Sequence, residues 1–414
     1  MRNASVTVPG RRTWSRRDFF RSGLMGGAVT ALATPVAATP ISARPFEDSI
    51  YMRLLGVEPH FAGHEHTTFV GGSRMPPEVM RAMAEANEYF VDMHQLVAAA
   101  GRRIAEVTHA EAGLVTAGSF SALILGGAAC LTGSDLEKIV ALPHPTWDRR
   151  ECLIQTGHRF GYDRAYRAAG MVIVEAETRE QFVEAISDRT AMIAGLASVE
   201  RRENPPPNLM MPEELIAIGR SAGVPVLIDA ASEIPPVANI SRYTEMGADL
   251  VVISGGKGIR GPQGTGMLAG RTDLIEAARL HAFPNSHLGR GMKVGKEAIV
   301  GLVVALNRWV SLDHEAVIET WNRKSRYLVE MLQGIPGLTA EYAPSPKGYA
   351  DVRITWDEAV IPLTLKDAQE RLAEGTPKIM WFDPVFMTRC LEDGEEIVVA
   401  RRLRAFFAEH VRTA

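Results

Sequence analysis

The chain has 414 residues, 46% of them hydrophobic, and a formal net charge of -4. This length is enough for two domains, each with its own core. The charges are mixed along the sequence without a basic stripe, which excludes a nucleic-acid partner of the usual kind. Cys130, Cys152 and Cys390 lie far apart and lack metal-ligand spacing, so no metal site and no complete set of disulfides is predicted.

The N-terminus is typical of an export signal. Five arginines lie within residues 11–21, and a weakly apolar stretch follows over residues 23–33. That stretch is too short for a membrane span. The run "SRRDFF" resembles the twin-arginine signal, in which paired arginines precede bulky apolar residues. Residues 1–43 are therefore predicted to be a signal and linker, cleaved near Ala38, that sends a periplasmic or secreted protein through the twin-arginine machinery. A disordered basic tail is the alternative.

The rest of the chain predicts a large α/β domain and a small α+β domain. An arm over residues 44–75 is expected to be extended, and residues 76–107 have the apolar spacing of helix. Short, nearly all-apolar runs then alternate with helical stretches, which indicates a mostly parallel sheet covered on both faces. The predicted strands are near residues 114–115, 152–154, 171–174, 192–196, 226–228, 250–253 and 266–269.

The C-terminal part reads differently. A helical region is predicted over residues 294–332, followed by strands near 351–355 and 378–382 and helices near 363–373 and 395–411. We therefore divide the chain into the signal and linker (1–43), the arm (44–75), the large domain (76–285), and a linking helix with the small domain (286–414).

The loop "SGGKGIRGPQGTG" contains Gly256, Gly258 and Gly261, which match the GxGxxG fingerprint of dinucleotide-binding turns. That mechanism needs a helix that starts at the loop. Here Pro262 follows at once and a second apolar strand comes next, so a dinucleotide site is not predicted. The glycines instead leave room around Lys257.

The surroundings of this lysine match the needs of pyridoxal phosphate. A lysine amine binds the aldehyde as a Schiff base, and an acid pairs with the pyridinium nitrogen. Asp229 ends an apolar strand, where a carboxylate is costly unless it is paired. The small-residue turn at 116–121 precedes an apolar helix and is suited to a phosphate. Each feature also has a simpler explanation. Asp229 can cap a helix, Lys257 can be a solvated loop lysine, and the turn at 116–121 can be an ordinary N-cap.

Two further residues are candidates for the faces of the cofactor ring. His158 follows the strand at 152–154 and is expected to stack on the ring. The alternative is a surface or core histidine. In that case the nearby Arg159 and Tyr162 are other candidates for the site. Ala231 is small enough to lie against the opposite face.

Together these features resemble fold-type I pyridoxal-phosphate enzymes, in the branch of selenocysteine synthase and D-glucosaminate-6-phosphate ammonia-lyase-like proteins. The matching stretches cover most of residues 69–310 and include "GGSRMPPEVMRAM", "IDAASEIPP" and "ISGGKGIRGPQGTGMLAG". The resemblance implies a large, mostly parallel seven-stranded α/β/α domain, a small α+β domain, and a homodimer or higher oligomer. Selenocysteine synthases carry an acid directly before the lysine, where this chain has Gly256, and a tRNA substrate is not expected.

The expected site residues fall into three groups. Lys257 and Asp229 are the catalytic pair. The residues expected to bind the cofactor are Ala117, Gly118, Ser119, His158, Asp229, Ala231, Ser254 and Lys257. Those expected to bind an anionic group of the substrate are Arg353, Arg290, Lys293 and Arg74. Arg290 and Lys293 can instead meet the cofactor phosphate. Arg74 is expected to reach the site of a neighbouring subunit, and the alternative is that it merely fastens the arm.

The expected activity is carbon–nitrogen lyase chemistry by α,β-elimination on an amino acid or amino-sugar acid. A racemase or epimerase and an aminotransferase are alternatives, because a lysine that transfers protons serves all three. A more distant alternative is a non-catalytic exported protein on the same fold.

Overall fold

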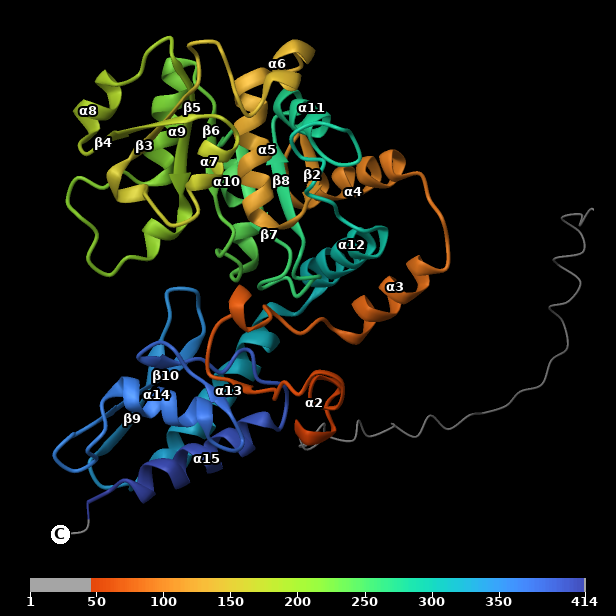
Figure 1. Ribbon diagram of the computed structural model, residues 1–414. Coiled ribbons are helices and arrows are strands. Elements are labelled where there is room, and N and C mark those ends of the chain that lie inside the picture. The colour runs from red at the N-terminus through yellow and green to blue at the C-terminus, as the bar shows by residue number, and fades with distance from the viewer. Residues whose placement is uncertain (1–45, 413–414) are drawn as a thin grey trace, which may run out of the picture. The chain divides into compact units, whose positions relative to one another are not determined.

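A computed structural model describes residues 46–412 of the chain. Its largest sheet has seven strands in the order β2-β8-β7-β6-β5-β3-β4 (Figure 1). β8 is antiparallel to both of its neighbours, and all other pairs are parallel. The predicted seven-stranded, mostly parallel sheet is therefore confirmed. The strands are β2 Ala112–Thr116, β3 Glu151–Gln155, β4 Val172–Ala176, β5 Thr190–Leu196, β6 Val226–Asp229, β7 Leu250–Ser254 and β8 Gly266–Gly270.

The central strands are buried along their length, as their apolar composition requires. The most buried helix is α5, Gly118–Thr132, which packs on the sheet and contacts the helices α6, α7 and α11. The remaining helices of this part are α6 Leu136–Ala141, α7 Arg164–Ala168, α8 Arg179–Glu184, α9 Pro212–Ala222, α10 Arg242–Glu245 and α11 Thr272–His281.

Two regions predicted to be mostly helical each contain two helices. Residues 76–107 form α3 Pro77–Asn87 and α4 Met93–Thr108, and α4 starts anew because the Asp92 side chain accepts hydrogen bonds from the N–H groups of His94 and Gln95. The later region forms α12 Lys296–Ser311 and α13 His314–Leu332. α12 packs against α3 and α4 and contributes to the core around the large sheet.

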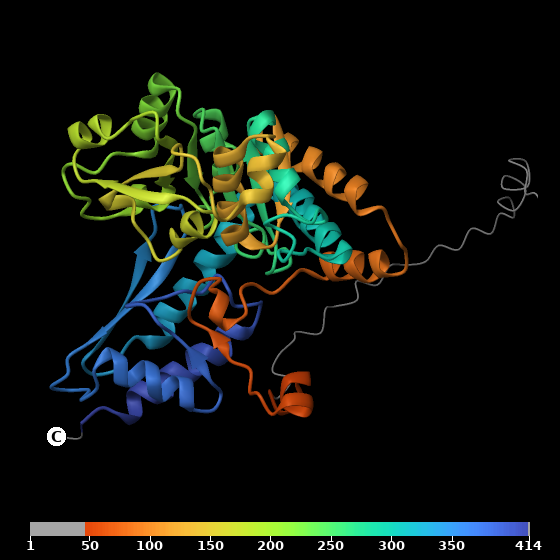
Figure 2. The same ribbon diagram turned by 45° about the horizontal axis from the view of Figure 1, so that its top comes forward.

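A second hydrophobic core lies around a three-stranded sheet of order β12-β10-β9. Figure 2 shows the β9–β10 hairpin beside the helices α14 and α15. β9 and β12 were not predicted, and the arm, which was expected to be extended, contains the short helix α2 Ile50–Leu55. Phe61 of the arm belongs to the second core. The elements are β9 Leu338–Pro344, β10 Ala350–Trp356, β12 Val385–Phe386, α14 Leu365–Glu374 and α15 Glu395–Glu409, with β1 Phe61–Ala62 paired to β11 Ile379–Met380.

Within residues 46–412, no helix combines the length and the apolar character needed to cross a bilayer. The predicted signal lies outside the described residues. The thiols of Cys130, Cys152 and Cys390 are free, and Cys152 is buried.

Candidate active site

A cavity of about 980 Å³ lies where several strands of the large sheet end. Its wall is formed by the arm at residues 66–72, the turn after β2, the loop after β3, the end of β6 and the loop after β7. The carboxyl ends of parallel strands are the usual place for ligands in open α/β sheets. The volume is also typical of small-molecule sites.

Lys257 lies in the loop after β7 and borders this cavity. The loop is closed by two backbone hydrogen bonds, from Arg260 N to Lys257 O at 2.9 Å and from Gly261 N to Gly255 O at 2.8 Å. A Cβ atom on Gly256 would lie 2.4 Å from Cα of Gln263. That position therefore has no room for the acid found in selenocysteine synthases, and close packing explains the glycine.

Asp229 ends β6 and is buried in the wall of the same cavity. Its Oδ1 accepts a hydrogen bond from the N–H of Ala231 at 2.9 Å, and no other described residue donates to this carboxylate. Burial raises the pKa of Asp229 from 3.8 to about 6, although the Ala231 N–H and the nearby charge of Lys257 oppose the shift. The carboxylate thus lacks a cationic N–H partner of the kind that a pyridinium ring supplies.

The turn before α5 forms another part of the wall. α5 starts at Gly118 after the N-cap residue Ala117, and no side chain in the described part of the chain caps its first N–H groups. Uncapped N–H groups at a helix start favour an anion such as a phosphate. The hydroxyl of Ser121 donates to Ala117 O at 2.8 Å inside the helix, whereas Ser119 borders the cavity.

These features fit pyridoxal phosphate. One cavity combines an amine, a carboxylate short of a partner and a helix start suited to a phosphate. The expected cofactor residues that border it are Ala117, Gly118, Ser119, Asp229, Ala231, Ser254 and Lys257. Their individual contacts with the cofactor stay predictions.

His158 does not belong to this group, and the prediction that it stacks on the ring is wrong. It is fully buried, its Nε2–H donates to Met210 O at 2.8 Å, and its Nδ1 accepts from Leu196 N at 2.9 Å. Both ring nitrogens therefore serve the fold. The aromatic side chains that border the cavity are Phe120, Phe160 and Tyr162.

The four cations expected to bind the substrate also lie off the cavity of the single chain. Arg353 is exposed on β10, and Lys293 is exposed before α12. Arg290 is exposed with its guanidinium 5.6 Å from the ring centroid of Phe283. Arg74 binds Glu395 and thus fastens the arm. None of these four described residues borders the cavity of its own chain, so the prediction that they bind the substrate there is wrong.

Two polar residues of the wall were not predicted. Arg164 follows the loop after β3, and within the described part of the chain its one hydrogen bond runs from Nε to Gly161 O at 2.8 Å. His66 comes from the arm, and no described residue forms a hydrogen bond with its ring. Burial, together with the charge of Arg389, lowers the pKa of His66 to about 3, so its imidazole is neutral. No periodic pattern in the sequence marks either residue as part of a site. Arg164 does lie close in sequence to Tyr162, which is one of the site candidates from the sequence.

Charged residues behind the wall are paired with one another. Arg389 binds Asp351 at 2.8 Å and Glu65 at 3.1 Å, and Lys347 donates to Ser232 O at 2.6 Å. Among the described residues, the Lys and Arg side chains that border the cavity are those of Lys257 and Arg164. Neither of them has a carboxylate partner within 4.0 Å anywhere in residues 46–412. They are the ones available to a substrate.

Comparison with known proteins gives a consistent result. The family model described as "Aminotransferase class-V" matches residues 178–351. A 5'-C-glycyluridine monooxygenase-decarboxylase from Streptomyces sp is 33% identical over 86% of this chain and 92% of its own length. D-glucosaminate-6-phosphate ammonia lyase from Salmonella typhimurium is 27% identical over 83% of this chain and 94% of its own.

The solved structure of a D-glucosaminate-6-phosphate ammonia-lyase has the same fold as this chain. The TM-score is 0.77 at 25% sequence identity, and the match covers 88% of this chain and 99% of that one. L-seryl-tRNA(Sec) selenium transferases also match, over shorter lengths. The fold class expected from the sequence is thereby confirmed.

Proposed function

The chain belongs to the pyridoxal-phosphate-dependent family that includes D-glucosaminate-6-phosphate ammonia lyase and the selenium transferases, and we propose that it is a carbon–nitrogen lyase that acts on an amino acid or amino-sugar acid. The observation that carries the proposal is the presence of Lys257 and Asp229 in one cavity. The relatives support a pyridoxal-phosphate enzyme, and the ammonia lyase supports the reaction class.

The roles of the residues follow from their positions. When bound, pyridoxal phosphate supplies an electron sink for negative charge at the substrate Cα. Lys257 holds the cofactor aldehyde and, once its amine is free, removes the Cα proton. Asp229 holds the proton on the ring nitrogen, and the start of α5 binds the phosphate. Arg164 binds the substrate carboxylate, because its terminal guanidinium nitrogens have no partner among residues 46–412.

In the proposed lyase reaction the substrate loses its Cα proton and a substituent at Cβ, and water then releases ammonia and leaves a keto acid. A second candidate is an oxygen-dependent decarboxylation, favoured by the 33% identity to the Streptomyces monooxygenase-decarboxylase. A racemase and an aminotransferase use the same lysine but have no counterpart among these two relatives.

The first experiment is an absorption spectrum of the purified protein. We expect a visible band that is lost in Lys257→Ala, because the covalent bond to the cofactor requires this amine. Lys366→Ala is the matched control, since the side chain of Lys366 is 81% exposed on α14 and should leave the band unchanged. A wild-type protein that stays colourless after addition of pyridoxal phosphate would refute the cofactor assignment.

The reaction class is tested with a panel of amino acids and amino-sugar acids. Ammonia and keto acid in equal amounts, without oxygen uptake, would support the lyase. Carbon dioxide release coupled to oxygen uptake would support the second candidate. Inversion of a chiral substrate without ammonia would instead indicate a racemase.

We also propose that the chain is exported through the twin-arginine route, on the strength of the "SRRDFF" run. Conversion of Arg16 and Arg17 to lysine is expected to keep the protein in the cytoplasm, because the two residues are the signal's defining pair. Cell fractionation with antibody detection measures this. A double variant that still reaches the periplasm would contradict the route.

A further inference from the structure

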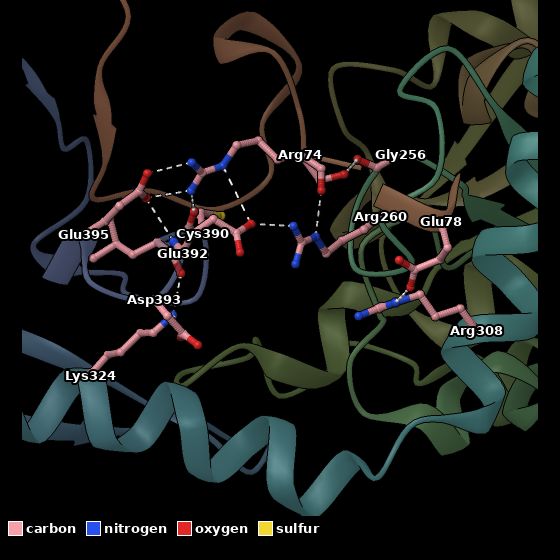
Figure 3. A network of polar contacts seen from close by, with 12 residues as sticks. Arg74, Glu78, Gly256, Arg260, Arg308, Lys324, Cys390, Glu392, Asp393 and Glu395 are labelled. Carbon is pink, nitrogen blue, oxygen red and sulfur yellow. Dashed lines mark hydrogen bonds and ion pairs between the residues drawn. The ribbon is translucent and has the colours of Figure 1, made fainter. Parts of the chain in front are cut away.

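The arm holds the Lys257 loop on both sides of the lysine. Before it, the hydroxyl of Ser73 donates to the carbonyl of Gly256 at 2.9 Å. After it, Nε of Arg260 donates to the carbonyl of Arg74 at 2.7 Å. Figure 3 shows these contacts where the arm passes along the loop. The consecutive arm residues Ser73 and Arg74 thus contact Gly256 and Arg260, which lie before and after Lys257 in the loop.

Arg260 has a backbone conformation that needs such support. Its φ is 60°, in the left-handed region that residues with a Cβ rarely adopt. Conformations of this kind persist where the surroundings fix them, and they gather at functional sites. Two hydrogen bonds of the Arg260 side chain provide this support. One is the bond from Nε to Arg74 O, and the other runs from Nη2 to the carboxylate of Glu392.

The other end of this arrangement belongs to the segment 390–395, which leads into α15. Arg74 donates to both carboxylate oxygens of Glu395, at 2.7 and 2.6 Å, and to Cys390 O at 2.8 Å. The side chain of Glu395 is only 12% exposed, so it is a fixed acceptor. The lysine loop is therefore connected through the arm to the second core.

We propose that Ser73 and Arg260 are positioning residues for Lys257, and this rests on the proposed role of Lys257 as the cofactor lysine. Glycines on both sides of Lys257 leave the backbone little intrinsic preference. The hydrogen bonds of Ser73 and Arg260 select the conformation that delivers the amine to the cavity. Reaction rates are sensitive to such placement, because a displacement of about 1 Å can cost about a hundredfold.

The test compares two ligands in the cofactor-free protein. Pyridoxal phosphate forms a covalent bond with the lysine, whereas pyridoxamine phosphate has the same ring and phosphate but no aldehyde. In Arg260→Gly and Ser73→Ala we expect covalent binding of pyridoxal phosphate to be roughly tenfold slower, with affinity for pyridoxamine phosphate unchanged. Arg260→Gly removes the side-chain contacts without straining the backbone, because glycine accepts the 60° φ.

The matched control is Arg308→Ala. Arg308 binds Glu78 at 2.6 Å between α12 and α3, and its side chain is 26% exposed, compared with 28% for Arg260. This variant should bind both ligands like the wild type. If Arg260→Gly and Ser73→Ala react with pyridoxal phosphate at the wild-type rate, or if they lose affinity for both ligands equally, the positioning role is overturned. Ser73→Ala removes a single oxygen and provides the test if Arg260→Gly does not fold.

The result can be separated from the proposed function. A wild-type protein that binds neither ligand contradicts the cofactor assignment, and a wild-type protein that binds both validates the comparison. Mass spectrometry after borohydride reduction identifies Lys257 as the modified residue in each variant, which keeps a different lysine from being mistaken for it.

Discussion

The carboxylate of Asp229 is held in the cavity wall at the cost of fold stability. It is buried at the end of β6 and has one backbone N–H as its partner. Because its pKa in the folded, cofactor-free protein is about 6, above the ordinary 3.8, ionisation of this group disfavours the folded state. The shift corresponds to about 3 kcal/mol at neutral pH. A bound pyridinium would offset this cost by pairing with the carboxylate.

A pH dependence of stability follows from the direction of this shift. The contribution of Asp229 is neutral below about pH 4, and it becomes destabilising as the pH rises from about 4 to about 6. We expect the free energy of unfolding of the cofactor-free protein to carry an Asp229 penalty that grows by about 1 kcal/mol between about pH 5 and about pH 7.5. Asp229→Asn should remove this penalty. Urea denaturation of both proteins at the two pH values measures it, and parallel pH profiles would contradict the buried carboxylate.

Some residues of the site could be predicted from the sequence and others could not. Asp229 ends an apolar strand and Lys257 follows one, so the local pattern sets their position at the sheet edge. His158 also follows a strand, but whether it points to the cavity or the core depends on its partners at Met210 and Leu196, which lie far away in the sequence. Arm residues such as His66 reach the cavity through tertiary packing alone.

At the scale of elements, the start of α5 is the feature most closely adapted to a ligand. Gly118 has a φ of 78°, and no atom would lie within 4 Å of a Cβ added to it. A side chain at this position would therefore strain the backbone without clashing with a neighbour. Gly266 of β8 packs close by, because its added Cβ would lie 2.5 Å from the carbonyl carbon of Gly118. This turn is therefore fixed in a shape that leaves its N–H groups without a side-chain cap.

Gly118→Ala is predicted to weaken phosphate binding. The substitution should shift the turn away from its φ of 78° at a cost of about 1 kcal/mol, so affinity for pyridoxamine phosphate should fall several-fold while that for pyridoxamine, which lacks the phosphate, changes little. Isothermal titration calorimetry measures both. Gly133→Ala is the control, since Gly133 at the other end of α5 also has a positive φ, 52°, and free space for a Cβ. Equal losses of affinity in the two variants would count against a phosphate at this helix start.

Elements were predictable where burial gives them a strong pattern. The strands of the large sheet are covered on both faces and appear as apolar runs. β9 is largely exposed, and β1 and β12 have two residues each, so long-range pairing and not composition defines them. The divisions between α3 and α4 and between α12 and α13 were missed because apolar spacing continues across the capping residues Asp92 and Asp313.

At the scale of the whole molecule, exposed apolar side chains gather in the N-terminal part of the described chain. α2 exposes Ile50, Tyr51, Leu54 and Leu55, each by more than half of its surface. The link between α3 and α4 adds Phe90, which is fully exposed. Four large apolar side chains exposed on one short helix are typical of protein interfaces. They support the expectation from the sequence that the chain forms a homodimer or a higher oligomer, and we propose that a second copy covers α2.

Substitution of Leu54 and Leu55 by glutamate is therefore predicted to dissociate the oligomer. Burial of each leucine would contribute about 1.5–3 kcal/mol to association, and two buried charges would oppose it further. Size-exclusion chromatography with light scattering should show at least two chains per particle for the wild type and one for the double variant. Leu136→Glu is the control, because Leu136 is 64% exposed on α6, outside the arm. A wild-type monomer, or a double variant that keeps the wild-type mass, would show that α2 is not the contact, and cofactor binding by the double variant would show whether the cavity is complete within one chain.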